Sequence, residues 1–248
     1  MNKDEIIKAQ AMDKIRQCCD KNFITNTTFL DIHAQSLLRR MTDQSKFDCE
    51  IRFFGGHEEA ERVVMICVPQ YMELETADIF KLIRVTGRND GKPLSHGDFL
   101  GSLLGLGIKR EMTGDIIVRE NGADIIVLEE IAEYIASNYL KVGRQSISSE
   151  IAGIEELIVS QSKKQIFPAS ISSLRLDNVV SSGFRISRSK AVEGIKARNV
   201  YVNHIEISDP DFKLKEGDLI GFRKKGRIRL SEIRGKTKKD RFSVTFEK

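Results

Sequence analysis

The apolar residues of this chain repeat with two different periods, and the change from one period to the other constrains the fold more than any other feature. Two stripes with the three- and four-residue spacing of a helix face occupy the first 45 residues. They consist of Ile7, Ala11, Ile15 and Cys18, and of Ala34, Leu37, Leu38 and Met41. Asp31 stands where the second helix would begin and is a suitable N-cap. Residues 1–45 are therefore predicted to form an N-terminal helical hairpin.

From Asp48 onward the apolar residues alternate with polar ones, which is the period of a strand. The segments predicted as strands are 49–53, 63–68, 79–85, 116–118 and 125–127. One helix is expected after Ser95, whose spacing to Asp98 is that of a capping box, and another over 128–139. Strands with two helices on one side predict an α+β sandwich. Residues 146–162 are predicted to form a further, connecting helix.

Positive charge is concentrated near the C-terminus. Residues 170–248 contain nineteen Lys and Arg against ten Asp and Glu, a balance of +9, whereas the whole chain has a net charge of +4. The rest of the chain must then carry about −5. This asymmetry indicates a basic module on a nearly neutral body, for which a polyanion is the natural partner. Charge alone does not distinguish RNA from DNA or from anionic lipid.

Several classes of protein are disfavoured by composition. No apolar run approaches eighteen residues, so no membrane-spanning helix is expected, and the charged N-terminus favours the cytoplasm over secretion. The four cysteines form no Cys-x-x-Cys pair, which argues against a zinc site and a disulfide framework. We expect reduced thiols, no metal and no cofactor. With 248 residues and 40% hydrophobic content, the chain can fold as two or three small domains.

A string of residues between 175 and 229 carries most of the functional information. Its parts are Arg175-Leu176-Asp177, Gly183-Phe184-Arg185-Ile186-Ser187-Arg188-Ser189-Lys190-Ala191, Val200-Tyr201-Val202-Asn203, Gly217-Asp218 and Gly226-Arg227. Leu176, Val179 and Val180 predict one apolar helix face, with Asp177 complementing the helix dipole. Gly183 is predicted to end this helix as a left-handed cap, and Ser187 to cap the next one.

This arrangement predicts a binding surface for folded RNA. Arg185, Arg188 and Lys190 should gather around a helix N-terminus, which is a suitable phosphate site, and the turn at 224–227 should add a second basic edge. The RNA-binding candidates are Arg175, Arg185, Ser187, Arg188, Lys190, Lys196, Arg198, Tyr201, Asn203, Arg223, Lys224, Lys225 and Arg227. Lys109 and Arg110 form either a second RNA face or simply a charged loop.

The string resembles the RNA-binding domain named after small-subunit ribosomal protein S-four, also called the alpha-L motif, over about residues 174–230. The chain departs from the usual pattern in two places, because Arg198-Asn199 and His204 stand where that family has glycine. Asn tolerates a left-handed backbone, so the fold should be kept, and Arg198 is expected to add an RNA contact. The type of the hairpin turn is left open.

The stretch from His96 to Ile116 resembles the central domain of the YlmH family, and the helical N-terminus and basic C-terminus fit that family's layout. The resemblance implies an α+β chain of three parts. These are an N-terminal helical region (1–45), a central domain like an RNA-recognition motif, with its connector helix (46–162), and an S-four-type RNA-binding domain (163–248). An aromatic ribonucleoprotein signature was not found. Phe53 and Phe54 could stack on bases, but core packing is favoured.

The resemblance also implies a function. It predicts a non-enzymatic, cytoplasmic, monomeric factor that binds ribosomal RNA and tRNA on the large ribosomal subunit and steadies peptidyl-tRNA on stalled subunits. A first alternative is an RNA-modifying enzyme with its active site in the central domain. His57, His96 and Asp98 offer only weak evidence for acid–base chemistry, because a capping box already explains Asp98. A second alternative is a structural partner in cell division, which predicts an exposed apolar surface.

Overall fold

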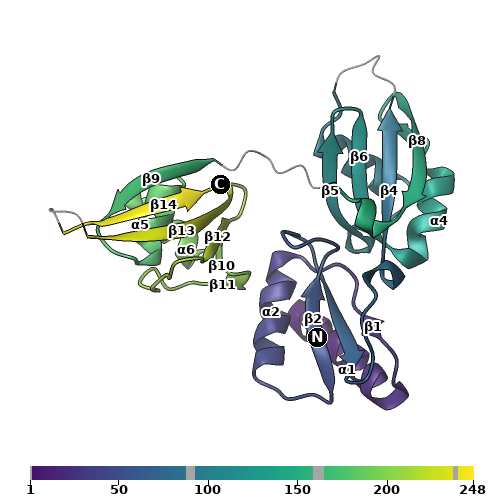
Figure 1. Cartoon of the computed structure of the whole chain (residues 1–248), viewed down its shortest axis with the longest axis horizontal. Coiled ribbons are helices and arrows are strands. Elements are labelled where there is room, and N and C mark those ends of the chain that lie inside the picture. The colour runs from purple at the N-terminus through teal and green to yellow at the C-terminus, as the bar shows by residue number, and fades with distance from the viewer. Residues whose placement is uncertain (1, 88–92, 159–164, 237–239) are drawn as a thin grey trace. The chain divides into compact units, whose positions relative to one another are not determined.

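The computed structural model describes residues 2–87, 93–158, 165–236 and 240–248. It divides into two compact units, residues 1–159 and residues 160–248, which are shown in Figure 1. Helices and strands occur in both units, which confirms the α+β class. In the part of the chain that the structure describes, no helix is both long and apolar enough to cross a membrane.

The first unit begins with two helices packed on a small antiparallel sheet. The elements are α1 (Lys3–Lys21), β1 (Thr25–Asn26), α2 (Ile32–Asp43), β2 (Cys49–Phe54) and β3 (Val64–Pro69), with strand order β1-β3-β2. Both predicted helices are present, and Asp31 caps α2 by accepting a 2.8 Å hydrogen bond from the Ala34 backbone N–H. The stripes on the two helices meet Met65 and Cys67 of β3 in one apolar cluster.

A second, five-stranded antiparallel sheet follows in the same unit, with order β5-β6-β4-β8-β7. Its strands are β4 (Phe80–Gly87), β5 (Thr113–Arg119), β6 (Gly122–Leu128), β7 (Lys141–Val142) and β8 (Gln145–Ala152). Helices α3 (His96–Gly105) and α4 (Glu129–Asn138) cover one face, as Figure 1 shows for α4, and single turns of 3₁₀ helix lie at Thr76–Asp78, Arg110–Met112 and Ile154–Glu156. The predicted capping box of α3 forms between Ser95 and Asp98.

The opposite face of this central sheet is partly covered by the N-terminal strands. Val64, Ile66 and Val68 of β3 pack against Leu82 and Ile126 of the central sheet. All six residues of β3 are buried, because its two faces serve two different cores. The prediction that strands 49–53 and 63–68 belong to the central sandwich was therefore wrong: they pair in a separate sheet, since alternation shows that a segment is a strand and not which sheet it joins.

The prediction of a connecting helix over 146–162 was also wrong, because the described residues of this segment do not form an α-helix. Gln145–Ala152 is strand β8, which pairs with β4 in the register Arg84↔Glu150. The apolar residues Ile147 and Ile151 are four apart, a spacing that fits one face of a helix and one face of a strand equally. Residues 159–162 of the predicted helix lie outside the described part of the chain.

The second unit is a six-stranded antiparallel sheet with two helices, α5 (Leu176–Gly183) and α6 (Arg188–Lys196), on one face. The strand order is β11-β10-β12-β13-β14-β9. The strands are β9 (Ile166–Ile171), β10 (Val200–Val202), β11 (Ile205–Glu206), β12 (Leu219–Phe222), β13 (Gly226–Lys236) and β14 (Phe242–Glu247). The division of the chain at 45/46 and at 162/163 stays a prediction.

Gly183 has a different role from the predicted one. It lies within the last turn of α5, and the residue with a left-handed backbone is Arg185 (φ 53°). A side chain at position 183 would collide with the Cδ1 atom of Ile228 on β13. Glycine allows α5 to pack closely on the sheet there, and the backbone at this position has no positive φ.

The structure also settles the hairpin that joins β10 to β11. Asn203 (φ 50°) and His204 (φ 67°) are the two turn residues between the paired Val202 and Ile205. Two consecutive positive φ angles define a type I′ turn, whose twist suits a two-residue hairpin. Arg198 (φ 58°) takes the other left-handed position that glycine has in the S-four-type pattern.

The contrast between two helical glycines gives a matched test of this packing. Gly183→Ala should destabilise the protein by ~1–3 kcal/mol, because the new methyl group overpacks the contact between α5 and β13. Gly101→Ala in α3 should instead stabilise it by ~0.5–1 kcal/mol, since nothing lies within 4 Å of the added carbon. Urea denaturation of the full chain measures both effects. Equal effects of the same sign would contradict this account.

Candidate nucleic-acid interface

The start of helix α6 presents polar and cationic groups to solvent. Ser187 caps this helix, since its Oγ accepts a hydrogen bond from the Lys190 backbone N–H at 3.3 Å, as predicted. Ser187, Arg188 and Lys190 are all exposed. Exposed cations at a helix start suit a phosphate, and its binding at this position stays a prediction.

A buried carboxylate holds two of the predicted arginines. Asp177, whose side chain is 2% exposed, accepts a 2.9 Å hydrogen bond at Oδ2 from Nε of Arg188 and forms a salt bridge with Nη2 of the same arginine at 2.8 Å. Arg175 approaches the same carboxylate with Nε at 3.2 Å from Oδ1 and Nη2 at 3.2 Å from Oδ2. Arg188 is still 56% exposed, so its guanidinium is oriented by Asp177 and remains accessible to a ligand.

The two guanidiniums also fix the charge of Asp177. Burial alone would raise the pKa of this carboxyl, but its hydrogen bonds with Arg175 and Arg188 outweigh burial and hold the pKa below its ordinary value. Asp177 is therefore ionised at neutral pH. Arg175 has a second acidic partner in Asp211, so two carboxylates already neutralise it. Of the two arginines, Arg188 is the better placed to contact a phosphate.

Arg185 is held by an aromatic ring. Its guanidinium carbon lies 5.3 Å from the centre of the Phe167 ring, which is within the range of a cation–π contact. Phe167 belongs to β9, which pairs with the C-terminal strand β14. Arg185 itself is exposed. Sequence reasoning missed Phe167, because no local pattern links residues eighteen positions apart.

Two further candidates lie at the end of α6. Lys196 is exposed in the last turn of that helix, and Arg198 follows it with a positive φ. Arg198 lies 3.7 Å from Glu206 across the hairpin, while its side chain stays 69% exposed. Both residues are accessible, and their RNA contacts stay predictions.

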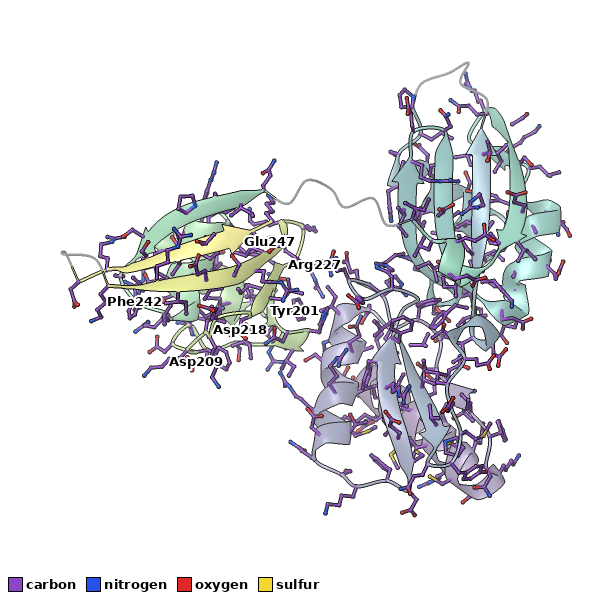
Figure 2. All side chains as sticks on the ribbon, viewed as in Figure 1. Tyr201, Asp209, Asp218, Arg227, Phe242 and Glu247 are labelled. Carbon is purple, nitrogen blue, oxygen red and sulfur yellow. The ribbon has the colours of Figure 1, made fainter. Side chains whose placement is uncertain are left out.

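The predicted second basic edge is the loop between β12 and β13. Arg223, Lys224 and Lys225 are exposed there, and Lys224 has a left-handed backbone (φ 65°). Arg227 follows on β13 and is half-buried. Arg227 pairs with Gly221 of β12, and Gly221 pairs with Tyr201 of β10, so Arg227 and Tyr201 are in register two strands apart. Figure 2 shows Arg227 and Phe242 at opposite ends of this sheet. The loop thus brings three exposed cations together at one end of the sheet, between two central strands.

Tyr201 and Asn203 have structural roles. Tyr201 is only 2% exposed, and its hydroxyl accepts a 3.1 Å hydrogen bond from Nη2 of Arg223. It cannot contact RNA directly in this conformation, so that prediction is corrected. The amide of Asn203 donates to Asp218 at 2.8 Å and accepts from the Leu219 backbone N–H at 2.9 Å. These bonds tie the β10–β11 turn to the start of β12.

The two residues of the second candidate face, Lys109 and Arg110, differ in exposure. Lys109 is exposed. The Nη1 atom of Arg110 donates to the carbonyl oxygens of Thr113 (2.7 Å) and Gly114 (3.1 Å), so part of this side chain supports the loop. Lys109 and Arg110 therefore do not form one exposed surface for RNA. A contact of RNA with Lys109 alone stays a prediction.

The two phenylalanines of β2 that could have stacked on bases are used in packing within the first unit. Phe54 packs edge-on against Phe80 at 5.9 Å between ring centres, and Phe53 lies under Arg39, so both are used in packing. The face of the central sheet opposite α3 and α4 is open beyond the area covered by β3. There, Arg84 and Arg119 pair with the fully buried Asp124 at 3.3 and 3.0 Å. This sheet face is thus covered at one end and internally paired at the other.

The carboxylates that lie near the candidate catalytic histidines have structural roles. Asp98 accepts from the Ser95 backbone N–H at 2.8 Å within the α3 capping box. His57 lies 3.2 Å from Asp115, which also accepts hydrogen bonds from the backbone N–H groups of Glu61 and Arg62. Burial would raise the pKa of Asp115, but these bonds hold it below its ordinary value. The pair connects the N-terminal strands to β5.

The cysteines occupy a packing position as well. All four are free thiols, and Cys18, Cys49 and Cys67 are buried together between α1, β2 and β3. Burial raises the pKa of Cys67 to about 11, so this thiol stays protonated at neutral pH. Within the described residues, no group of three or more His, Cys, Asp or Glu side chains is arranged to hold a metal ion.

Comparison with known proteins agrees with this geometry. Residues 75–156 match a family model described as "Putative RNA-binding domain in YlmH", and residues 174–220 match the S4 domain. The chain is 37% identical, over 224 residues, to the ribosome-associated protein quality control protein P2 of Bacillus subtilis. That match covers 90% of this chain and 86% of the relative.

A solved structure is similar too. The cell division protein ylmH from Streptococcus pneumoniae superposes with a TM-score of 0.52 and 25% sequence identity, covering 64% of this chain and 96% of that one. The two domain matches and the near full-length relative agree with the central sheet and the C-terminal helix pair described above. The chain therefore belongs to the YlmH family, with an S4 domain as its C-terminal unit.

Proposed function

We propose that this protein is a non-enzymatic RNA-binding factor of ribosome-associated quality control. In this proposal it acts in the cytoplasm as a monomer, binds ribosomal RNA and tRNA on the large ribosomal subunit, and holds peptidyl-tRNA on stalled subunits. The observation that carries the RNA-binding part is the exposed Arg188, oriented by buried Asp177 beside Arg185, Ser187 and Lys190.

The physical argument for RNA rests on the arrangement of these cations. Folded RNA is recognised mainly by its shape and phosphate backbone, and a rigid cation loses less entropy on binding than a mobile one. Asp177 and Phe167 each hold an arginine in place at the start of α6. The exposed loop at 223–225 supplies further cations. One group of oriented cations and a second group of exposed ones suit the backbone of a structured RNA.

The ribosomal part of the proposal rests on the named relatives. The Bacillus subtilis protein named for ribosome-associated quality control matches 90% of this chain at 37% identity. The Streptococcus pneumoniae protein named for cell division matches 64% of it at 25% identity. The first match extends over more of the chain at higher identity, so we favour quality control over division.

An RNA-modifying enzyme is the weaker alternative. The His57–Asp115 pair joins two parts of the first unit, and Asp98 completes a helix cap, so both carboxylates have structural reasons to be where they are. An enzyme of this kind would modify RNA in the presence of the appropriate donor, whereas a binding factor would not.

Replacing Arg185, Arg188 and Lys190 by Ala tests the proposal. RNA affinity should fall, and the slope of log affinity against log salt should become shallower by roughly 2–3, since each lost phosphate contact removes about 0.7–0.9. Sedimentation with purified large ribosomal subunits at several salt concentrations measures both. The matched control replaces the exposed Lys8, Arg16 and Lys21 of α1. Equal loss in the two triple variants would overturn the assigned surface.

Asp177→Asn separates orientation from simple charge. Removing a negative charge near RNA would strengthen binding if only Coulomb attraction mattered. If Asp177 orients Arg188, affinity should instead fall roughly two- to tenfold, since ordering one long side chain costs ~0.5–1.5 kcal/mol. RNA titration of the folded variant measures this, with thermal unfolding as the check of folding.

Two further variants complete that experiment. Asp209→Asn removes a charge from an exposed residue of the same unit, labelled in Figure 2, and should leave affinity unchanged or slightly increased. In an Arg188→Gln background, Asp177→Asn should change RNA affinity less than it does in the native chain, because the arginine that Asp177 orients is no longer present. Tighter binding by Asp177→Asn would refute the orienting role.

A further inference from the structure

The first unit contains a cavity that none of the roles described so far uses. Its volume is about 710 Å³, which lies within the range of ~300–1,000 Å³ typical of small-molecule sites. Helix α1 forms one wall, the segment 27–31 forms another, and Arg62 and Arg110 line it as well. All of its lining residues belong to the first unit.

Backbone carbonyls hold the two arginines side by side. Nε of Arg62 and Nη1 of Arg110 donate to the same carbonyl oxygen, that of Thr113, at 3.1 and 2.7 Å. Nη2 of Arg62 donates to the carbonyl oxygens of Phe29 (3.0 Å) and Arg110 (3.3 Å). Both guanidiniums are half-buried, so their positions are fixed before any ligand arrives.

Among the described residues neither arginine forms a direct salt bridge with a carboxylate, although the charges of Asp31 and Asp115 act on Arg62 from a greater distance. The nearby Asp115 accepts hydrogen bonds from His57 and from backbone N–H groups instead. Burial lowers the pKa of Arg110 to about 10, and the charge of Arg62 contributes to that shift. Burial likewise lowers the pKa of Arg62. In both arginines these effects outweigh the nearby carboxylates, and an anion in direct contact would relieve the remaining repulsion.

The free hydrogen-bond donors of the pair favour an anion with several acceptor oxygens. Among the described residues, Nη1 of Arg62 and both Nε and Nη2 of Arg110 donate to no protein acceptor. Guanidinium groups match the geometry of phosphate oxygens and can bind them through two bonds at once.

The other walls limit the size and charge of the ligand. The charged lining residues are Lys3, Lys14, Arg62 and Arg110 against Asp13, Asp31 and Glu111, an excess of one positive charge. That excess is too small to attract a polyanion, but it suits a small anion in direct contact with the arginines. Ile6, Ile7 and Leu30 supply an apolar wall. The ligand should therefore combine one phosphate with an apolar body.

We propose that this cavity binds a small phosphate monoester of about nucleotide size, with its phosphate on Arg62 and Arg110 and its less polar part against Ile7 and Leu30. Inorganic phosphate shares the recognised group and should bind more weakly, because it leaves the apolar wall unused. The nucleoside without phosphate should not bind, since the arginines would then be left without their anion.

Nuclear magnetic resonance of the arginine Nε–H groups tests this in the native full-length protein. Titration with adenosine monophosphate should shift the Arg62 and Arg110 signals, inorganic phosphate should shift them at higher concentration, and adenosine should not. Arg84 and Arg119, already paired with Asp124, serve as internal controls and should not move. No shift, equal shifts at the control arginines, equal response to adenosine, or binding of inorganic phosphate alone would each overturn the proposal.

A pair of α1 variants adds a test that leaves the two arginines intact. Lys14→Ala removes a cation from the cavity wall and should weaken binding of adenosine monophosphate about three- to tenfold, as expected for one charged contact. Lys8→Ala removes an exposed cation from the same helix outside the cavity and should leave binding unchanged. Equal affinities of the two variants would contradict the proposed site.

Discussion

The buried carboxylate of Asp177 is the interaction on which the C-terminal surface depends. A carboxylate that is 2% exposed would be costly alone, and two arginines compensate for its charge. The same contact fixes the start of α5 relative to the start of α6, because Arg175 precedes one helix and Arg188 begins the other. One ion pair thus stabilises the helix pair and orients a cation toward solvent.

The central sheet shows a different use of charge. Helices α3 and α4 cover one of its faces, and β3 covers part of the other. In the uncovered part, Arg84 and Arg119 are turned onto the buried Asp124. The side chain of Arg84 is 20% exposed, whereas that of Arg188 is 56% exposed. The exposed cations of the C-terminal unit are therefore better suited to contact RNA.

Much of this fold could be predicted from local patterns. The helix stripes, the Ser187 cap and the RNA-binding motif depend on residues close in sequence, and each was found. Long-range packing could not be predicted in the same way. Gly183 makes room for Ile228, which lies on a distant strand. Tyr201 was expected on an exposed face, but all three residues of β10 are buried. Strand β8 was missed because two isoleucines four apart suit either period.

The most direct test of the central claim is residue-level mapping of RNA crosslinks on the protein in cells. The account predicts crosslinks at the start of α6, around 185–190, and in the loop at 223–225, with the RNA partners in ribosomal RNA and tRNA. Crosslinks confined to the open face of the central sheet, or an absence of crosslinks to the C-terminal unit, would contradict it.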